Sequence, residues 1–263
     1  MNVTQIFAIA KKEIKLNFRF KWNYFGDAIL QPLRFVILFS VVYSGFFLSG
    51  AKEIGGITQT NFISFLILGS LVHTFFSFGF NIFKTKFINE KYWQTILSFL
   101  VAPVHRLKLV IGIGLSELPR LGIILVIFLG IAYLITPIAF AKLLLVILII
   151  FLAFLGTLGV SLIIGAFSLA NEDTLFAFSY IYWGWTFLSC LYYPLSSLPR
   201  FLHLAVRINP IYHCIEFIRE LWLGLSGTTA VHLCFIIPFA ILAPVIGVYL
   251  FNKIIKKIGI TGY

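Results

Sequence analysis

The residues of this chain that could carry out chemistry are few and far apart. Its three cysteines, Cys190, Cys214 and Cys234, form no CxxC pair, and its two aspartates, Asp27 and Asp173, are widely separated. A zinc or magnesium site needs several converging ligands, so this spacing favours neither a metal site nor the acidic cluster of a lipid-diphosphate transferase. The chain also has no GxxxxGK[ST] motif to hold ATP phosphates. We therefore expect no metal or cofactor bound by this chain and no enzymatic activity of its own.

One pair of opposite charges lies inside an apolar segment. Glu117 and Arg120 are three residues apart, so they can pair on one face of a helix. Ionisable residues inside a membrane segment mark a candidate functional site. Both lie about two to three helical turns from one end of their segment. A structural or gating ion pair is the favoured interpretation, and contact with a substrate is the alternative.

The composition is that of an integral membrane protein. Hydrophobic residues make up 60% of the 263 residues and charged residues 11%, whereas a soluble domain has about 25% charged residues. The net charge of +11 does not indicate a nucleic-acid partner, because membrane proteins concentrate Lys and Arg in cytoplasmic loops. We expect membrane lipids, and no nucleic acid, around this chain.

The hydropathy pattern predicts an all-α integral membrane protein in which residues 1–263 form one transmembrane domain. Residues 1–22 have the pattern of an amphipathic helix that lies along the membrane interface. Six apolar segments then follow, each close to the length needed to cross a bilayer. The six predicted spans cover residues 25–48, 61–83, 109–135, 143–169, 175–193 and 231–251.

The distribution of basic residues predicts the orientation. Five lie in residues 1–22, five in the loop 84–108 and three in the tail after the last span, whereas five lie on the opposite side. Cytoplasmic segments carry the excess of Lys and Arg. We therefore expect both termini and the loop 84–108 in the cytoplasm, with the protein in the plasma membrane.

The loop 84–108 has the pattern of a short amphipathic helix between two basic ends. Its apolar residues at 93, 96, 97 and 100 fall on one helical face, and Pro103 would end the helix. Such a helix could dock a cytoplasmic partner or could lie passively at the membrane interface. These residues alone leave both interpretations open.

The segment 194–229 combines helix breakers with apolar helical stretches. Prolines 194, 199 and 210 interrupt any continuous helix, yet residues 201–206 and 211–225 are apolar and helical in pattern. Two short re-entrant helices on the outer side would satisfy both observations, because broken backbone is tolerated in a membrane where protein covers it.

The order of motifs here resembles that of the membrane subunits of ABC type-2 exporters. In that family the fifth span is followed by prolines, an Asn-Pro pair and a helix with an arginine and then a glycine. Glu216 lies three residues before Arg219 in that helix, so the two can form an intrahelical ion pair. The residues that match the family pattern are Pro194, Leu198, Pro199, Asn209, Pro210, Arg219 and Gly224.

The loop between the second and third spans is similar to the coupling helix of that family, which rests on the ATPase. The resemblance implies a permease that dimerises, a homodimer being the expectation, and that binds two copies of a separate ABC ATPase carrying ATP and magnesium. It also implies that the re-entrant helices cap the exit route. Docking then becomes the favoured interpretation of the loop. The coupling residues it implies are Glu90, Tyr92, Trp93, Ile96, Leu97, Pro103, His105 and Arg106.

The substrate is not specified by these motifs. The short outer loops look closest to members that export lipid-linked oligosaccharides or drugs, so we expect an amphipathic or lipid-linked substrate. Export of long polysaccharides is the alternative within the family. A secondary transporter or channel is the alternative of another class, and such proteins often have repeated halves, which are not evident here.

Overall fold

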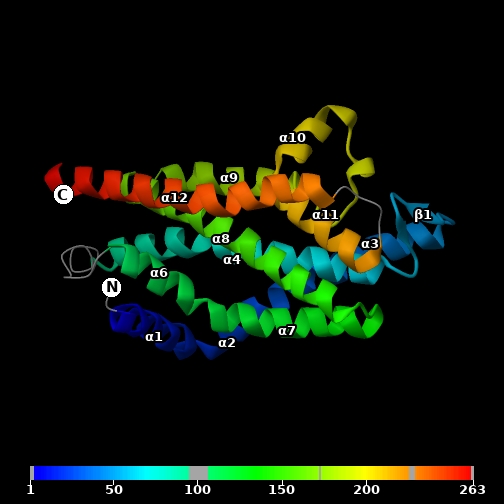
Figure 1. The fold of residues 1–263 in the computed structure, drawn as a ribbon, viewed down its shortest axis with the longest axis horizontal. Helices are drawn as coiled ribbons and strands as arrows, with labels where there is room; N and C mark the ends of the chain where they lie inside the picture. Colours follow the sequence, from blue (N-terminus) through cyan, green and yellow to red (C-terminus); the bar gives the residue numbers. More distant parts are fainter. Residues whose placement is uncertain (1–2, 95–105, 172, 225–228, 262–263) are drawn as a thin grey trace.

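The computed structural model describes residues 3–94, 106–171, 173–224 and 229–261. Its long helices lie side by side along the longest axis of the molecule (Figure 1). Both termini lie at one end, and a small β-hairpin lies at the other. The predicted all-α architecture is therefore confirmed for these residues, apart from strands β1 (Glu53–Ile54) and β2 (Ile57–Thr58), which pair in the expected polar turn.

Pro, Gly and polar residues divide the remaining chain into helices of unequal length. In chain order these are α1 (Val3–Arg19), α2 (Lys21–Phe25), the π-helical η1 (Gly26–Leu30), α3 (Gln31–Leu48), α4 (Phe62–Tyr92), α6 (Arg106–Ser116), α7 (Leu118–Ile135), α8 (Phe140–Ala170), α9 (Thr174–Phe187), the 3-10 turns η2 (Leu195–Ser197) and η3 (Arg200–Leu202), α10 (His203–Ile208), α11 (Pro210–Leu223) and α12 (Thr229–Thr261).

Five helical segments among the described residues are long and apolar enough to cross a membrane. They match the predicted first to fourth spans and the last one. The predicted fifth span differs, because α9 has 14 residues and reaches only about 21 Å. The five segments are Gly26–Leu48, Phe62–Tyr92, Leu107–Ile135, Phe140–Ala170 and Ala230–Ile254.

The chain leaves the helical path after Phe187, six residues before the predicted end of the fifth span at residue 193. Cys190 adopts a left-handed backbone conformation with φ of 50°, which a helix does not tolerate. The carbonyl oxygens of Cys190 and Leu191 accept hydrogen bonds from the side chain of Arg219 instead of closing helical turns. A contact distant in sequence therefore ends α9.

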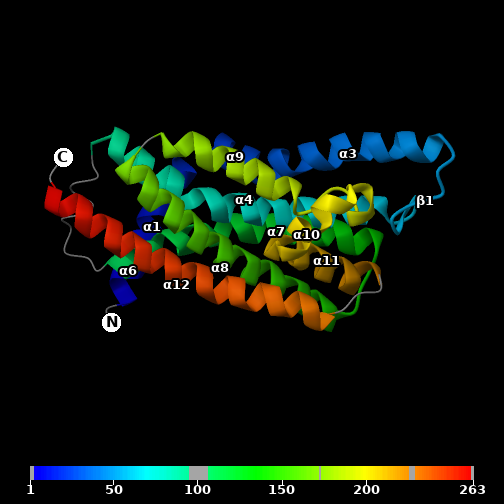
Figure 2. The same cartoon turned by 90° about the horizontal axis from the view of Figure 1, so that it is seen from above.

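Helix α4 forms the centre of the bundle. Residues 64–76 are buried without interruption, and α4 packs against α8, which in turn packs along α12. Gly159 of α8 lets α12 approach closely, since a Cβ there would overlap the backbone at Ala243 and Pro244. In Figure 2, α3 and α12 lie at opposite edges of the bundle, so α4 and α8 are covered from both sides.

Helix α1 packs along α6 at the end that carries the termini. Ile6 and Ala10 are buried in this contact. Gly112 permits it, because a Cβ at that position would lie 2.8 Å from the Cβ of Ile9. The helix predicted over residues 1–22 is thus present as α1 and α2, while its location at a membrane interface stays a prediction.

The short helix predicted within the loop 84–108 lies mostly outside the described residues, and its first predicted apolar residue, Trp93, lies in a turn. Helix α4 continues past the expected boundary at residue 83 and ends at Tyr92. Trp93 and Gln94 form a turn, and Gln94 has a φ of 56°, which breaks the helix. Four of the predicted coupling residues, Ile96, Leu97, Pro103 and His105, lie outside the described residues.

The segment after α9 contains two short helices separated where the sequence predicts. Asn209 and Pro210 divide α10 from α11, and α10 projects from the side of the bundle (Figure 1). Helix α11 packs against α4, α8 and α12. How deeply these helices enter a membrane, and hence their re-entrant character, remains a prediction.

Candidate functional site

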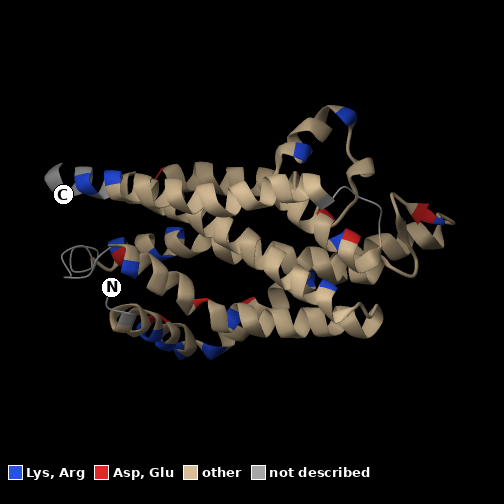
Figure 3. Ribbon diagram, in the orientation of Figure 1, with Lys and Arg blue, Asp and Glu red and all other residues tan. Residues whose placement is uncertain are grey.

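Basic residues gather at the end of the molecule that carries the termini (Figure 3). There, Lys86 of α4 lies between two carboxylates. Its Nζ is 2.7 Å from Oε2 of Glu13 in α1 and 3.1 Å from Oε1 of Glu90, one turn further along α4. This bridge joins α1 to the last turns of α4.

A second lysine ties α1 to the helix on the other side of the loop. Lys108 of α6 donates a hydrogen bond of 2.7 Å to Oε1 of Gln5. Together with the packing of α1 along α6, Lys86 and Lys108 make α1, α6 and the end of α4 one connected unit. We define these three elements as the basic-end unit.

The predicted coupling residues occupy two different environments in this unit. Tyr92 and Trp93 are 63% and 67% exposed at the end of α4, so both can contact a partner. Glu90 is 6% exposed and faces inward toward Lys86, so it positions the helix end rather than presenting a surface charge. Arg106 is the first residue of α6, and its side chain lies outside the described part of the structure.

The Glu117–Arg120 pair lies at the break between α6 and α7. Nη1 of Arg120 is 3.6 Å from Oε2 of Glu117, and Oε1 of Glu117 accepts a hydrogen bond of 3.1 Å from Asn17. The guanidinium group also lies 4.4 Å from the ring centroid of Tyr24, a cation–π distance. Together these contacts join α1 and α2 to the break.

Both charge networks line one cavity of about 760 Å³, to which Glu13, Lys86, Glu117 and Arg120 all contribute. The predicted intramembrane pair, Glu117 and Arg120, therefore lines a cavity and contacts α1 instead of being enclosed among its own helix neighbours. Local sequence patterns carry no signal for this cavity, because Glu13, Lys86 and Glu117 lie about 30 to 100 positions apart in the chain.

Arg219 is the centre of the opposite end of the bundle. Its side chain is fully buried, and Nη1 donates hydrogen bonds of 2.9 Å both to the Cys190 carbonyl oxygen and to Oε1 of Glu216. Nη2 donates a bond of 2.6 Å to the carbonyl oxygen of Leu191. The guanidinium carbon lies 3.4 Å from the ring centroid of Phe65 in α4. We call this set of contacts the Arg219 clasp.

Arg219 stays charged although its environment opposes the charge. Burial lowers the pKa of the guanidinium group, and the carboxylate of Glu216 offsets part of this shift. Because the pKa of arginine starts far above neutral pH, the group remains protonated. The predicted ion pair of Glu216 and Arg219 is present, whereas Glu220 instead contacts Nε2 of His232 in α12 at 2.7 Å.

Asn209 links the short helices to α9. Its Oδ1 accepts hydrogen bonds from the backbone N–H of Ile211 (2.9 Å) and from Nε1 of Trp185 (2.7 Å), and its Nδ2 donates to Oγ of Ser189 (2.9 Å). Asn209 therefore caps α11, with Pro210 as the first helical residue, and fixes the end of α9.

The other residues of the predicted gate surround this link. Pro194 is buried, and Gly55 of the β-hairpin approaches it so closely that a Cβ on Gly55 would lie 2.8 Å from the Pro194 Cβ. The Leu198 carbonyl oxygen is 3.0 Å from Nε2 of His203. Pro199 is exposed at the start of η3. The structure thus places these residues in one layer at the end opposite the termini.

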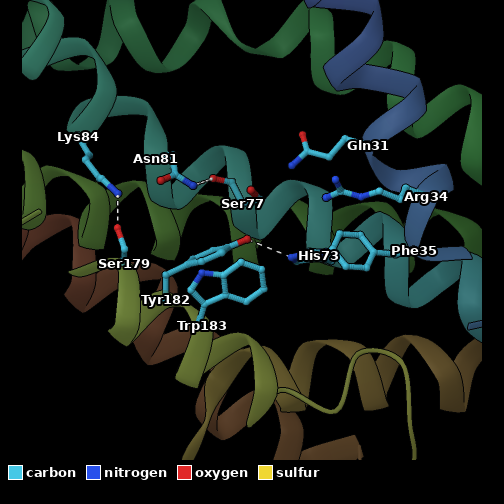
Figure 4. A pocket seen from close by; sticks show the side chains of 10 residues that line it. All are labelled: Gln31, Arg34, Phe35, His73, Ser77, Asn81, Lys84, Ser179, Tyr182 and Trp183. Carbon is cyan, nitrogen blue, oxygen red and sulfur yellow. Dashed lines mark hydrogen bonds between the residues drawn. The ribbon is translucent and has the colours of Figure 1, made fainter. Parts of the chain in front are cut away.

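A smaller cavity of about 260 Å³ lies between α3, α4 and α9 (Figure 4). His73 reaches its edge and contacts two tyrosine hydroxyls, Tyr192 through Nδ1 at 2.7 Å and Tyr182 through Nε2 at 3.0 Å. His73 therefore makes the interhelical hydrogen bonds typical of polar residues in membrane helices. Arg34 and Lys84 also line the cavity, and the hydropathy pattern alone does not predict that they lie at one site.

A comparison with protein families gives a match over most of the chain. The family described as ABC-2 type transporter matches residues 4–223, a range that includes the basic-end unit, both cavities and the Arg219 clasp. A search of curated proteins finds no match to the chain. The matched range covers most of the 263 residues, and the apolar helices are those of a multi-pass membrane permease. The chain therefore belongs to the ABC-2 type transporter family.

Proposed function

We propose that this chain is the transmembrane permease subunit of an ATP-driven exporter in the plasma membrane. Two copies would form a dimeric path for an amphipathic or lipid-linked substrate. ATP and magnesium would be held by two copies of a separate ABC ATPase subunit, since the chain has no phosphate-binding loop. Family membership supports transport, and the arrangement of the two ends supports the coupling to an ATPase.

The observation that carries this proposal is the continuity of α4 between the two ends. Its 31 residues extend about 46 Å. The helix is joined to α1 through Lys86 at one end and touches the Arg219 clasp through Phe65 at the other. A force applied near Trp93 would therefore reach the predicted exit gate through one rigid helix.

The orientation follows from charge. The basic-end unit and the C-terminal part of α12 carry the excess of Lys and Arg (Figure 3), which favours a cytoplasmic location for both termini. The Arg219 clasp and α10 would then lie on the outer side. In this arrangement α9 and the turn after it count as the fifth of six spans, and α10 and α11 are the re-entrant helices.

The compact outer layer supports a substrate like those of the lipo-oligosaccharide and drug export branch. The outer segments 49–60 and 194–209 are short. They pack together where Gly55 approaches the buried Pro194. They leave no large outer domain within the described residues. Export of a long polysaccharide is the alternative within the family.

The experiment that tests this proposal is reconstitution in lipid nanodiscs with the ABC ATPase that co-purifies with the chain. We expect the permease to stimulate ATP hydrolysis, and Trp93→Ala to reduce that stimulation several-fold, because Trp93 is exposed at the proposed contact. Phe201→Ala, an exposed aromatic in the outer layer, should leave hydrolysis unchanged.

Vesicle transport separates this function from the other class. Uptake into inverted vesicles should require ATP and the partner ATPase. Transport at full rate with neither present would overturn the proposal and would favour a secondary transporter or channel.

A further inference from the structure

We propose that the cavity between α3, α4 and α9 binds a phosphate-bearing, anionic headgroup of an amphipathic substrate through Arg34 and Lys84. This inference rests on the proposed function and names the chemical class of the substrate that would be carried. It starts from two cations in a hollow that runs along apolar membrane helices.

The two cations enter the cavity from opposite ends. Along α4 the lining extends from His73 to Lys84, which is about 16 Å at 1.5 Å per residue. The guanidinium carbon of Arg34 in α3 lies 5.1 Å from the ring centroid of Phe35, and Figure 4 shows the guanidinium group directed into the space between the helices. Lys84 approaches from the other end, where its Nζ is 3.3 Å from Oγ of Ser179.

Neither cation has an anionic partner among the described residues. The carboxylates that do form ion pairs there are bound to other cations, and no ion pair includes Arg34 or Lys84. The described residues that line the cavity include no Asp or Glu. An uncompensated charge is costly near the interior of a membrane, so the arrangement favours a ligand that supplies the negative charge.

The rest of the lining fits a phosphate group. Asn81 and Ser77 lie between the two cations, and Nδ2 of Asn81 donates a hydrogen bond of 2.9 Å to the Ser77 carbonyl oxygen, which leaves its second N–H for a ligand. An arginine fork can donate two parallel hydrogen bonds to phosphate oxygens, while a lysine adds a point charge. The two cationic side chains therefore give the cavity the donors of an anion site.

The volume and the surroundings favour an amphiphile over a free ion. The cavity of about 260 Å³ is smaller than the roughly 300–1,000 Å³ of a site for a whole drug-sized ligand, so it would hold a headgroup only. Helix α9 has no buried residue over its described length, Thr174–Phe187. Its exposed apolar side chains, of which Trp183 also lines the cavity, give a surface for a tail, namely Phe176, Tyr180, Ile181, Trp183 and Phe187.

The test is equilibrium binding of 1-oleoyl lysophosphatidic acid to the full chain in phosphatidylcholine nanodiscs, without ATPase or nucleotide. We expect saturable binding that Arg34→Gln weakens about tenfold or more, the usual effect of losing a charge-assisted hydrogen bond. Lys84→Gln should weaken binding less. Arg34→Lys should recover part of the affinity, because it restores the charge without the fork.

The controls distinguish a built site from general attraction. Lys142→Gln removes an exposed cation outside the cavity and should leave binding unchanged. 1-Oleoyl lysophosphatidylcholine, which has the same tail and a zwitterionic headgroup, should bind at least tenfold more weakly. Thermal unfolding of each variant checks that the fold is retained, and Arg34→Lys provides the readout if Arg34→Gln fails to fold.

Several results would overturn the inference. If lysophosphatidic acid bound the wild type and the Arg34→Gln/Lys84→Gln double variant with equal affinity, the cavity would not be its binding site. If Lys142→Gln lost as much affinity as Arg34→Gln, the binding would come from general surface charge and not from the cavity. Displacement by inorganic phosphate at concentrations equal to the lipid would show an ion site without a role for the tail. None of these results depends on ATPase stimulation, so the proposed function would stand or fall separately.

Discussion

The two ends of the bundle each bury a cation, but they satisfy it differently. Lys86 at the basic end bonds to two carboxylates, Glu13 and Glu90, and its side chain keeps 15% exposure. Arg219 at the opposite end is fully buried and donates to two backbone carbonyl groups as well as to Glu216. Side-chain acceptors can follow a helix that shifts, whereas backbone acceptors cannot move without changing the fold. We infer that the Arg219 clasp holds a fixed shape and that the basic end transmits movement.

The largest effect on stability should come from Arg219→Gln. This change leaves the carbonyl groups of Cys190 and Leu191 without their donor, and breaking a buried charged network costs about 3 kcal/mol. For a chain of this size that corresponds to a fall of roughly 6–12 °C in the unfolding temperature. Arg200→Gln, on the exposed start of η3, should change it little. An equal fall in both variants would contradict the clasp.

Gly69→Ala should have the next largest effect. A Cβ at Gly69 would overlap the carbonyl oxygen of Leu191, which accepts a hydrogen bond from Arg219. Overpacking of this kind costs about 1–3 kcal/mol. Gly122→Ala is the matched control, since a Cβ there meets nothing within 4 Å. Thermal unfolding monitored by tryptophan fluorescence would give the unfolding temperature of both variants. An unfolding temperature of Gly69→Ala equal to that of the wild type would show that the turn after α9 can move.

Lys86→Met should have a smaller effect on stability and a larger one on coupling. It removes the bridge between α1 and α4 but keeps the aliphatic stem, so we expect a loss of about 1 kcal/mol. ATP hydrolysis by the partner should no longer respond fully to the permease, because α1 and α4 would move separately. Lys15→Met is the control, since Lys15 is exposed on α1. Normal coupling in Lys86→Met would show that the bridge is only structural.

Trp93→Ala should have the smallest effect on the isolated permease. Its side chain is 67% exposed, and exposed substitutions usually change stability by less than about 0.5 kcal/mol. The unfolding temperature should therefore match that of the wild type, while association with the ATPase weakens. A large loss of stability would mean that Trp93 packs within the permease and not against a partner.

The features that depend on local pattern were predictable from the sequence. Apolar length identified five of the spans, and the break at Asn209–Pro210 followed from proline chemistry. The Glu216–Arg219 pair followed from helical spacing, because residues three apart share a face. Each of these signals lies within one segment of the chain.

The features that join distant segments were not predictable. Helix α9 ends early because Arg219, about 30 residues later, binds the carbonyl groups of Cys190 and Leu191. Lys86 pairs with Glu13 across 73 positions. Trp93 lies in a turn beside a left-handed Gln94, for which the apolar periodicity of the loop gave no signal.

The sequence by itself determined that this protein lies in a membrane, which segments are apolar enough to cross it and where prolines break the chain, because hydrophobicity and backbone chemistry act locally. Only the tertiary structure decided which charges are paired, which are buried and which, like Arg34 and Lys84, line a cavity whose described residues include no Asp or Glu. The physical reason is that an ion pair or a cavity depends on distances in space between helices, and those distances are set by packing of the whole bundle.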